Sequence, residues 1–345
     1  MNELLRGTML FFSAFALSVS LSPVQAQAQS SREPMVYENA AGGPRLLEEG
    51  QPLAMVHATV EDAQKARESR APARTTTAGT SGGNLTYHGG TGGIGVETAP
   101  KVYLVFWGSQ WNNDDPSGEA VILESFYGGV GGNAWTNTVT QYCQGVASGS
   151  TFCNGAGVPA ANPSGIFAGH FYDNASAAPT HPKQSQIAAE AVRAAAHFGN
   201  TTASSNASVQ YVIATAHGNS SSGFGRQYCA YHSSTSSAYG NVAYTNLPYI
   251  TDAGASCGAN FNGLGADAGI TIVGGHEMAE TMTDQFPNGG WLDANGSEIG
   301  DKCAWISSGQ GAAAGIALST GTFPVQSLWS NAFNSDSGGC VLSYR

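Results

Sequence analysis

The chain has 345 residues, with 13 lysines and arginines against 24 acidic residues and a net charge of −11 when histidine is neutral. The imbalance is concentrated in residues 75–345, which hold six basic residues against sixteen acidic ones. Nucleic acid needs a positive protein surface for its phosphates, so this composition argues against a nucleic-acid partner and favours neutral or cationic ones.

The first 28 residues have the three-part layout of a secretory signal peptide. A polar start ends at Arg6, an apolar stretch runs from Met9 to Leu21, and small residues precede position 28. The apolar stretch is too short to cross a bilayer, and no later segment reaches that length. We therefore expect residues 1–28 to be removed. The mature protein should be secreted to the extracellular space, passing through a periplasm in transit, without a membrane segment.

Residues 29–80 are predicted to form a propeptide and linker. Residues 61–68 have helical composition, and a run rich in Thr, Gly and Ser follows at 75–83. The composition then shifts to Gly, Ser, Asn and aromatic residues, so residues 84–345 are predicted to form one catalytic domain with an ample core. We expect the mature protein to start between residues 74 and 86. The alternative interpretation of 29–80 is a flexible arm.

Periodicity predicts five elements within the domain. Aromatic and β-branched runs predict buried strands at 101–107 and 208–215. Helical spacing predicts helices at 119–127, 184–198 and 267–284, the last stopped by Pro287 and a following Gly pair. Strands with interposed helices indicate an α/β or α+β layered fold with a mixed sheet.

Six cysteines allow fifteen connectivities. We predict sequential pairing, because each bridge would then close a loop-rich region, including the segment after residue 300. The predicted bridges are Cys143–Cys153, Cys229–Cys257 and Cys303–Cys340.

The pentapeptide His276-Glu277-Met278-Ala279-Glu280 is the main functional signal. On a helix, His276 and Glu280 lie one turn apart on the same face, so both can bind one metal ion while Glu277 projects beside it. The familiar zinc motif has His at the second ligand position, but a carboxylate is an accepted zinc ligand. The preceding residues 269–275 are small and apolar, and a buried helix with three ionisable residues needs a compensating ion.

Glu277 is the expected general base. It would accept a proton from a zinc-activated water and pass that proton to the leaving amine. The alternative is an ordinary exposed acid on a surface helix.

Glu298 is the predicted third metal ligand, because a thermolysin-like arrangement supplies a glutamate after the motif helix and Glu298 follows His276 by 22 residues. Asp301, one turn further, is predicted to support the His276 ring from outside the ligand set. His232 is predicted to be catalytic as an oxyanion stabiliser, and it is also a rival ligand, as are Asp293 and Asp301. The turn at 293–296 is similar to a calcium loop, so Ca²⁺ is a second expected ion.

Several segments together resemble the Exordium, or phosphate-induced, family of secreted proteins. The segment 276–305 is also similar to secreted bacterial zinc metallopeptidases with a His-Glu-x-x-Glu motif. The resemblance spans residues 85–345 and is carried by 85–90, 103–108, 229–232, 276–280, Trp291 and 298–303. It implies a zincin-like layered domain with an active-site helix, and it supports the Cys229–Cys257 bridge, since the family has cysteines beside its His-containing loop.

We therefore expect a secreted zinc-dependent hydrolase, an endopeptidase made as a zymogen, acting as a monomer on protein or peptide substrates. The alternative is a secreted non-catalytic protein of the Exordium type that binds cell walls or glycans, or signals. In that case Trp107, Trp111, Trp135 and Trp291 could stack on sugars.

Overall fold

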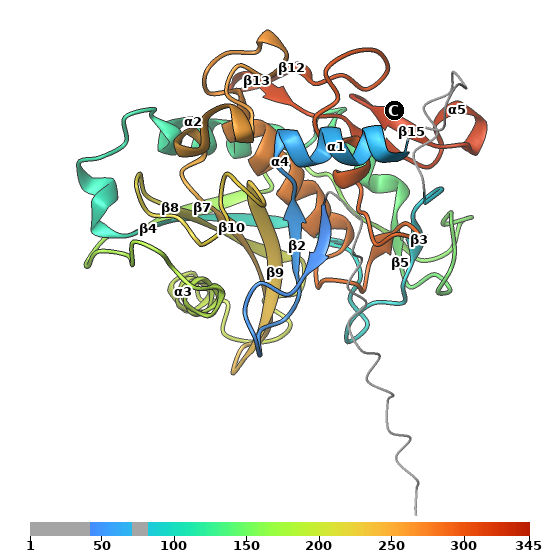
Figure 1. Ribbon diagram of the computed structural model, residues 1–345. Helices are drawn as coiled ribbons and strands as arrows, with labels where there is room; N and C mark the ends of the chain where they lie inside the picture. Colours follow the sequence, from blue (N-terminus) through green and yellow to red (C-terminus); the bar gives the residue numbers. More distant parts are fainter. Residues whose placement is uncertain (1–41, 71–81) are drawn as a thin grey trace, which may run out of the picture. The chain divides into compact units, whose positions relative to one another are not determined.

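A computed structural model describes residues 42–70 and 82–345, which form a mixed α/β structure (Figure 1). The expected signal peptide lies outside the described residues. A seven-stranded mixed sheet organises the rest. Its strands, in spatial order, are β1 Gly43–Arg45, β2 Ala54–His57, β9 Ala230–Ser237, β10 Gly240–Leu247, β8 Val209–Thr215, β4 Lys101–Trp107 and β7 Phe167–Asp173.

The sheet is parallel on one side and antiparallel on the other. Strands β10, β8, β4 and β7 are parallel neighbours, whereas β9 is antiparallel to β10, and β2 is antiparallel to both β9 and β1. All seven residues of β8 and six of the seven in β4 are buried, as expected for central parallel strands. The two strands predicted from the sequence are confirmed as β4 and β8.

Helices cover both faces of the sheet: α2 Glu119–Val130 and α4 Ala268–Thr283 pack on one face, and α3 Gln184–His197 packs on the other. The described chain also forms α1 Val60–Arg70, which contacts a 3-10 helix, and α5 Phe333–Asp336, which lies near the C-terminus. Short 3-10 helices are η1 Ser109–Asn112, η2 Thr136–Gln141, η3 Ile250–Cys257, η4 Phe261–Gly263 and η5 Asp301–Cys303. The predicted helices at 119–127, 184–198 and 267–284 are confirmed as α2, α3 and α4.

The alternation of side chains along β4 divides the core. Leu104 and Phe106 face the cluster that contains residues of α2 and α4, whereas Val105 and Trp107 face the cluster that contains residues of α3. In Figure 1, α3 accordingly lies on the opposite side of the sheet from α2 and α4.

Helix α4 is buried along its whole length, which the small and apolar residues 269–275 permit. It ends after Thr283, where the Asp284 carboxylate accepts backbone N–H groups of Asn288, Gly289 and Gly290. The chain then turns back, and the residues after β11, Trp291–Leu292, return to the polar side chains of the helix, where the backbone N–H of Asp301 donates to Glu280.

Smaller two-stranded sheets and three disulfides hold the remaining chain. Bridges Cys143–Cys153, Cys229–Cys257 and Cys303–Cys340 are present, as predicted. The two-stranded sheets comprise β3 Thr86–Tyr87 with β11 Trp291–Leu292, β5 Cys143–Gln144 with β6 Val158–Pro159, β12 Ala314–Leu318 with β13 Gly321–Val325, and β14 Leu328–Ser330 with β15 Gly339–Val341.

The described part of the predicted propeptide, residues 42–70, contributes β1, β2 and α1 to this unit. Whether the segment is removed stays a prediction. Among the helices of the described residues, none is long and apolar enough to cross a membrane.

Candidate metal centre and active site

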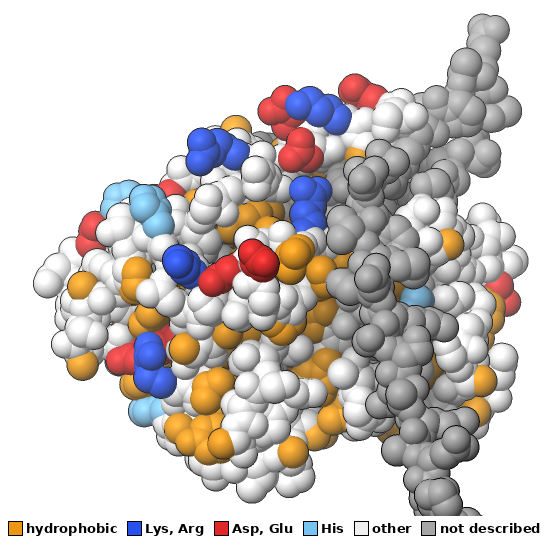
Figure 2. All heavy atoms as spheres, turned by 60° about the horizontal axis from the view of Figure 1, so that its bottom comes forward, with side chains coloured by type: hydrophobic (Ala, Val, Ile, Leu, Met, Phe, Trp, Pro, Cys, Tyr) orange, Lys and Arg blue, Asp and Glu red, His pale blue; other side chains and the backbone are white. Residues whose placement is uncertain are grey.

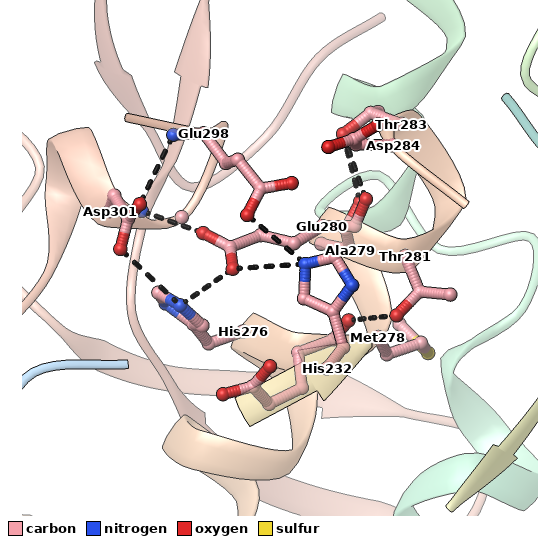
Figure 3. Close-up of polar contacts among 12 residues, drawn as sticks. His232, His276, Met278, Ala279, Glu280, Thr281, Thr283, Asp284, Glu298 and Asp301 are labelled. Atoms are coloured by element: carbon pink, nitrogen blue, oxygen red, sulfur yellow. Dashed lines mark hydrogen bonds and ion pairs between the residues drawn. The ribbon is translucent and has the colours of Figure 1, made fainter. Parts of the chain in front are cut away.

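Three parts of the chain bring the predicted site residues together beside α4 (Figure 3). Each of these side chains is buried. Helix α4 contributes His276, Glu277 and Glu280, and strand β9 contributes His232. The chain after β11 contributes Glu298 and Asp301.

One carboxylate oxygen lies between two imidazoles. Oε2 of Glu280 is 3.0 Å from Nε2 of His276 and 3.8 Å from Nε2 of His232. The first contact follows from the one-turn spacing on α4. The second arises because β9 runs past this helix, which sequence spacing alone does not reveal.

Glu298 and Asp301 complete the cluster from the returning chain. Oε2 of Glu298 lies 3.0 Å from Nε2 of His232, and Oδ1 of Asp301 lies 3.9 Å from Nε2 of His276. The backbone N–H of Asp301 also donates to Oε1 of Glu280 at 2.9 Å. Gly300 makes this approach possible, since a Cβ there would lie 2.5 Å from Nδ1 of His276.

Several ligand atoms in this cluster have no hydrogen-bond partner among the described residues. They are Nε2 of His276, Oε2 of Glu280, Oε1 of Glu298 and Oδ1 of Asp301, together with both carboxylate oxygens of Glu277. Buried polar atoms without partners are costly, and a cation bound by these atoms would satisfy them.

Three trios in the described chain have one ligand atom each within 4.8 Å of the others: His276, Glu280 and Asp301; His232, Glu277 and Glu280; and His57, His276 and Glu277. Nitrogen and carboxylate oxygen are donors that a metal such as zinc accepts. The residues present therefore fit a metal ion.

The electrostatics of the cluster also favour a bound cation. Burial raises the pKa of Glu277 and Glu298 well above the ordinary range, and the nearby charge of Glu280 adds to both shifts. Burial opposes ionisation of Glu280 too, but the charge of the neighbouring His276 outweighs burial and lowers the pKa of Glu280. Burial lowers the pKa of His232 to about 4, so its ring is neutral, the form that binds metals.

Asp301 is also buried close to Glu280, as Glu277 and Glu298 are. Burial raises its pKa well above the ordinary range, the charge of Glu280 adds to the shift, and Arg45 offsets part of it. A divalent cation would relieve the repulsion among these carboxylates.

Gln326 is a site residue that the sequence did not reveal. Its Oε1 lies 3.2 Å from Nδ1 of His276, and its Nε2 donates to the carbonyl of Gly300 at 2.8 Å. Gln326 thus contacts the ring nitrogen opposite the one that faces Glu280. Asp301, predicted to support this ring, lies near its other nitrogen, with Oδ1 3.9 Å from Nε2 of His276, and its role stays a prediction.

His57 is a second residue that sequence spacing could not find. Its ring is fully buried and stacks on that of His276, with centroids 3.7 Å apart and planes inclined by 4°. Neither ring nitrogen has a hydrogen-bond partner in the described chain. No motif pointed to it, because it lies in the segment predicted to be a propeptide.

The turn at 293–296, which is similar to a calcium loop, is stabilised by hydrogen bonds and an ion pair to the Asp293 carboxylate. The Asp293 carboxylate accepts the backbone N–H groups of Asn295 and Ser297 and lies 2.7 Å from Nζ of Lys302. A calcium ion at Asp293 would have to displace the Lys302 ammonium.

No protein-family model, curated protein or solved structure matches this chain. The resemblance to Exordium-type proteins and to secreted metallopeptidases stays a prediction.

Proposed function

We propose that this protein is a secreted zinc-dependent hydrolase that cleaves peptide bonds, with a zincin-like arrangement of sheet and active-site helix. The observation that carries the proposal is the arrangement around α4. His276 and His232 both approach Oε2 of Glu280, at 3.0 and 3.8 Å. The buried Glu277 carboxylate, next in sequence to His276, has no hydrogen-bond partner in the described residues.

His276, Glu280 and Glu298 would hold the ion, with His232 and Asp301 as alternative third ligands. When bound, zinc supplies Lewis-acid chemistry that polarises a carbonyl and acidifies water. The cluster's buried, unsatisfied nitrogen and carboxylate atoms support a metal ion here. His276 and Glu280 form a trio with Asp301 within 4.8 Å, whereas Glu298 belongs to none of the trios in the described chain, so its role as third ligand rests on the sequence spacing.

Glu277 would move the proton. Its carboxylate is buried in the cluster, and neither oxygen has a hydrogen-bond partner among the described residues, so both are available to a water held beside the ion. It would accept a proton from the attacking water and deliver it to the leaving amine. His232, if it is not a ligand, would stabilise the negative charge that develops on the carbonyl oxygen.

Other features support secretion and argue against a nucleic-acid partner, and we propose a protein or peptide substrate. Three disulfides are consistent with an oxidising compartment. On the face shown in Figure 2, Lys and Arg side chains are scattered among acidic ones instead of forming a continuous basic patch, which disfavours nucleic acid. We expect a monomer without a membrane segment, and a structural Ca²⁺ stays an expectation.

The alternative, a non-catalytic protein that binds cell walls or glycans, loses its proposed stacking platforms. The four tryptophans considered for it, Trp107, Trp111, Trp135 and Trp291, are at most 7% exposed. They fill the core and present no free ring face for a sugar.

Casein hydrolysis by the purified secreted protein tests the proposal. Hydrolysis should stop on chelation and return when zinc is restored, in proportion to the zinc bound. The variant His217→Ala is a suitable control, since His217 is partly exposed and pairs with Asp252. Hydrolysis that is unaffected by chelation would refute a metal-dependent reaction.

A further inference from the structure

Strand β2 covers the edge of the strand that carries His232. Its residues pair antiparallel with β9 in the register Met55 to His232, Val56 to Tyr231 and His57 to Ala230. The backbone N–H of Cys229 extends the ladder by donating to the carbonyl of His57 at 2.8 Å. Without β2, this edge would present unpaired N–H and C=O groups, which is the surface that binds an extended polypeptide by strand addition.

His57 carries this strand into the predicted active site. Its imidazole stacks on His276, and one of its nitrogens lies within 4.8 Å of ligand atoms of His276 and Glu277. A fully buried imidazole with no hydrogen-bond partner in the described chain is costly unless something binds it. The metal site beside it would supply that partner.

The start of the same segment reaches the other side of the cluster. A Cβ on Gly42 would overlap the Asp301 carboxylate, and Gly43 has a φ of +96°. The segment therefore contacts the predicted metal cluster at both His276 and Asp301, leaving little room for a substrate.

The described part of the predicted propeptide, residues 42–70, is not joined to the rest of the protein by a disulfide. All six cysteines lie between residues 143 and 340. Its contacts include Arg67, which donates to the carbonyls of Ala304 and Trp305, and Ala58, whose carbonyl accepts Nε1–H of Trp305. Cleavage between the segment and the body would leave non-covalent contacts alone to hold it.

We propose that residues 42–57 occupy the substrate position, so that β2 is an internal stand-in for an extended substrate peptide. After the segment leaves, a substrate would pair antiparallel with β9, and its backbone would pass Glu277. The fully buried Ala54, Met55 and Val56 indicate a preference for small and medium apolar side chains. The cleavage chemistry in this inference rests on the proposed function, whereas peptide binding at β9 does not.

The test uses the full chain with a site-specific protease sequence inserted within residues 75–80. Hydrogen exchange at residues 229–232 and casein hydrolysis are measured before and after the cut, with the β4 amides as an internal control for global unfolding. We expect both the exchange and the hydrolysis to rise at least about tenfold, while β4 stays protected.

A synthetic peptide of residues 50–60 is then added as the probe. It should restore protection at 229–232 and inhibit hydrolysis. The same peptide with His57→Ala should bind at least about tenfold more weakly. Thr59→Ala, outside residues 42–57, should bind as well as the unaltered peptide, because the Thr59 hydroxyl accepts the backbone N–H of Asp62, which the peptide lacks.

The outcomes separate the two proposals. An uncut chain that hydrolyses casein at the full rate would overturn this inference and leave the hydrolase proposal intact. Opening of β9 and rebinding of the peptide without hydrolysis would support the inference and contradict the hydrolase. Unchanged exchange at 229–232 after the cut would overturn the inference.

If the cut chain unfolds, two intact variants decide. Arg67→Ala removes two contacts that hold the segment, and Lys65→Ala removes only an exposed ion pair on the same helix. Exchange at 229–232 should be faster in Arg67→Ala than in Lys65→Ala. Equal exchange in the two variants would overturn the inference.

Discussion

The imidazole rings of His57 and His276 stack face to face, with centroids 3.7 Å apart. This contact joins a residue of the predicted propeptide to the first residue of the metal motif. Trp305 stacks on the other face of His57, with centroids 4.9 Å apart, and closes the cluster. In this structure, part of the predicted propeptide therefore covers the predicted active site.

Glu277→Gln should keep the metal and lose hydrolysis by at least about two orders of magnitude. The amide preserves the shape of the side chain but cannot accept the proton. Metal content and the rate of casein hydrolysis check this, with His217→Ala as the matched control. Full activity in Glu277→Gln would end the proposed mechanism.

Substitutions at the remaining cluster residues should separate ligands from supporting groups. Glu298→Ala should lose the metal, and His232→Ala should keep the metal and lose rate. Asp301→Ala should keep a site weakened by about 10- to 100-fold, the usual effect of losing an outer partner. Zinc titration of each purified variant measures these effects.

The contacts of Glu280 suggest the result that would contradict Glu298 as the third ligand. His232 lies 3.8 Å from the same Glu280 oxygen that contacts His276. If Glu298→Ala binds zinc normally and His232→Ala does not, the ligands are His276, Glu280 and His232, and the assignment of Glu298 is wrong.

The sequence predicted those parts of the fold that depend on local patterns. Central strands such as β4 are continuous apolar runs. Helix α4 spans Ala268–Thr283, close to the predicted bounds 267–284, which were set by its small apolar residues and by Pro287. The spacing within the helix placed His276 beside Glu280 without any tertiary information.

The remaining site residues depend on long-range packing. Gln326 reaches His276 from the chain after β13, and His57 reaches it through a strand of four residues that has no alternation to reveal it. The pairing of β2 with β9 joins segments about 175 residues apart, and nothing in either sequence specifies this partner.

Removing the Cys303–Cys340 bridge should destabilise the fold more than removing Cys143–Cys153. The bridged residues are separated by 37 positions in the first case and 10 in the second. Restriction of the unfolded chain predicts losses of about 4 and about 3 kcal/mol, respectively. Urea unfolding of the paired Cys→Ala variants measures the difference. A larger loss for the shorter loop would show that contacts in the folded state dominate.

Stability should fall as the pH rises from about 4.5 to about 8 because of Glu97. Burial raises its pKa from 4.5 to about 8, although a hydrogen bond from Gln210 partly opposes this. Between these two pH values the folded state keeps the Glu97 proton, whereas the unfolded state has lost it. Protonated Glu97 therefore contributes its full stabilisation below pH 4.5, the unfolded pKa, and this stabilisation is lost as the pH rises to about 8, the folded pKa.

Glu97→Gln should therefore be more stable than the wild type at pH 9, by a few kcal/mol, and should have a shallower pH dependence. Urea midpoints at pH 5, 7 and 9 check this, with Glu68→Gln on the exposed side of α1 as the control. Parallel pH profiles for wild type and Glu97→Gln would show that Glu97 does not titrate in this range.

Metal content tests the central claim most directly, because it does not depend on whether the segment at 42–57 covers the site. Purified wild-type chain, dialysed against trace zinc and analysed by elemental mass spectrometry, should hold one equivalent. His276→Ala should hold less than about a tenth of that, since a direct ligand is lost, while His217→Ala should match the wild type. A wild-type chain that binds no zinc, or a His276→Ala chain that binds it equally well, would contradict the account.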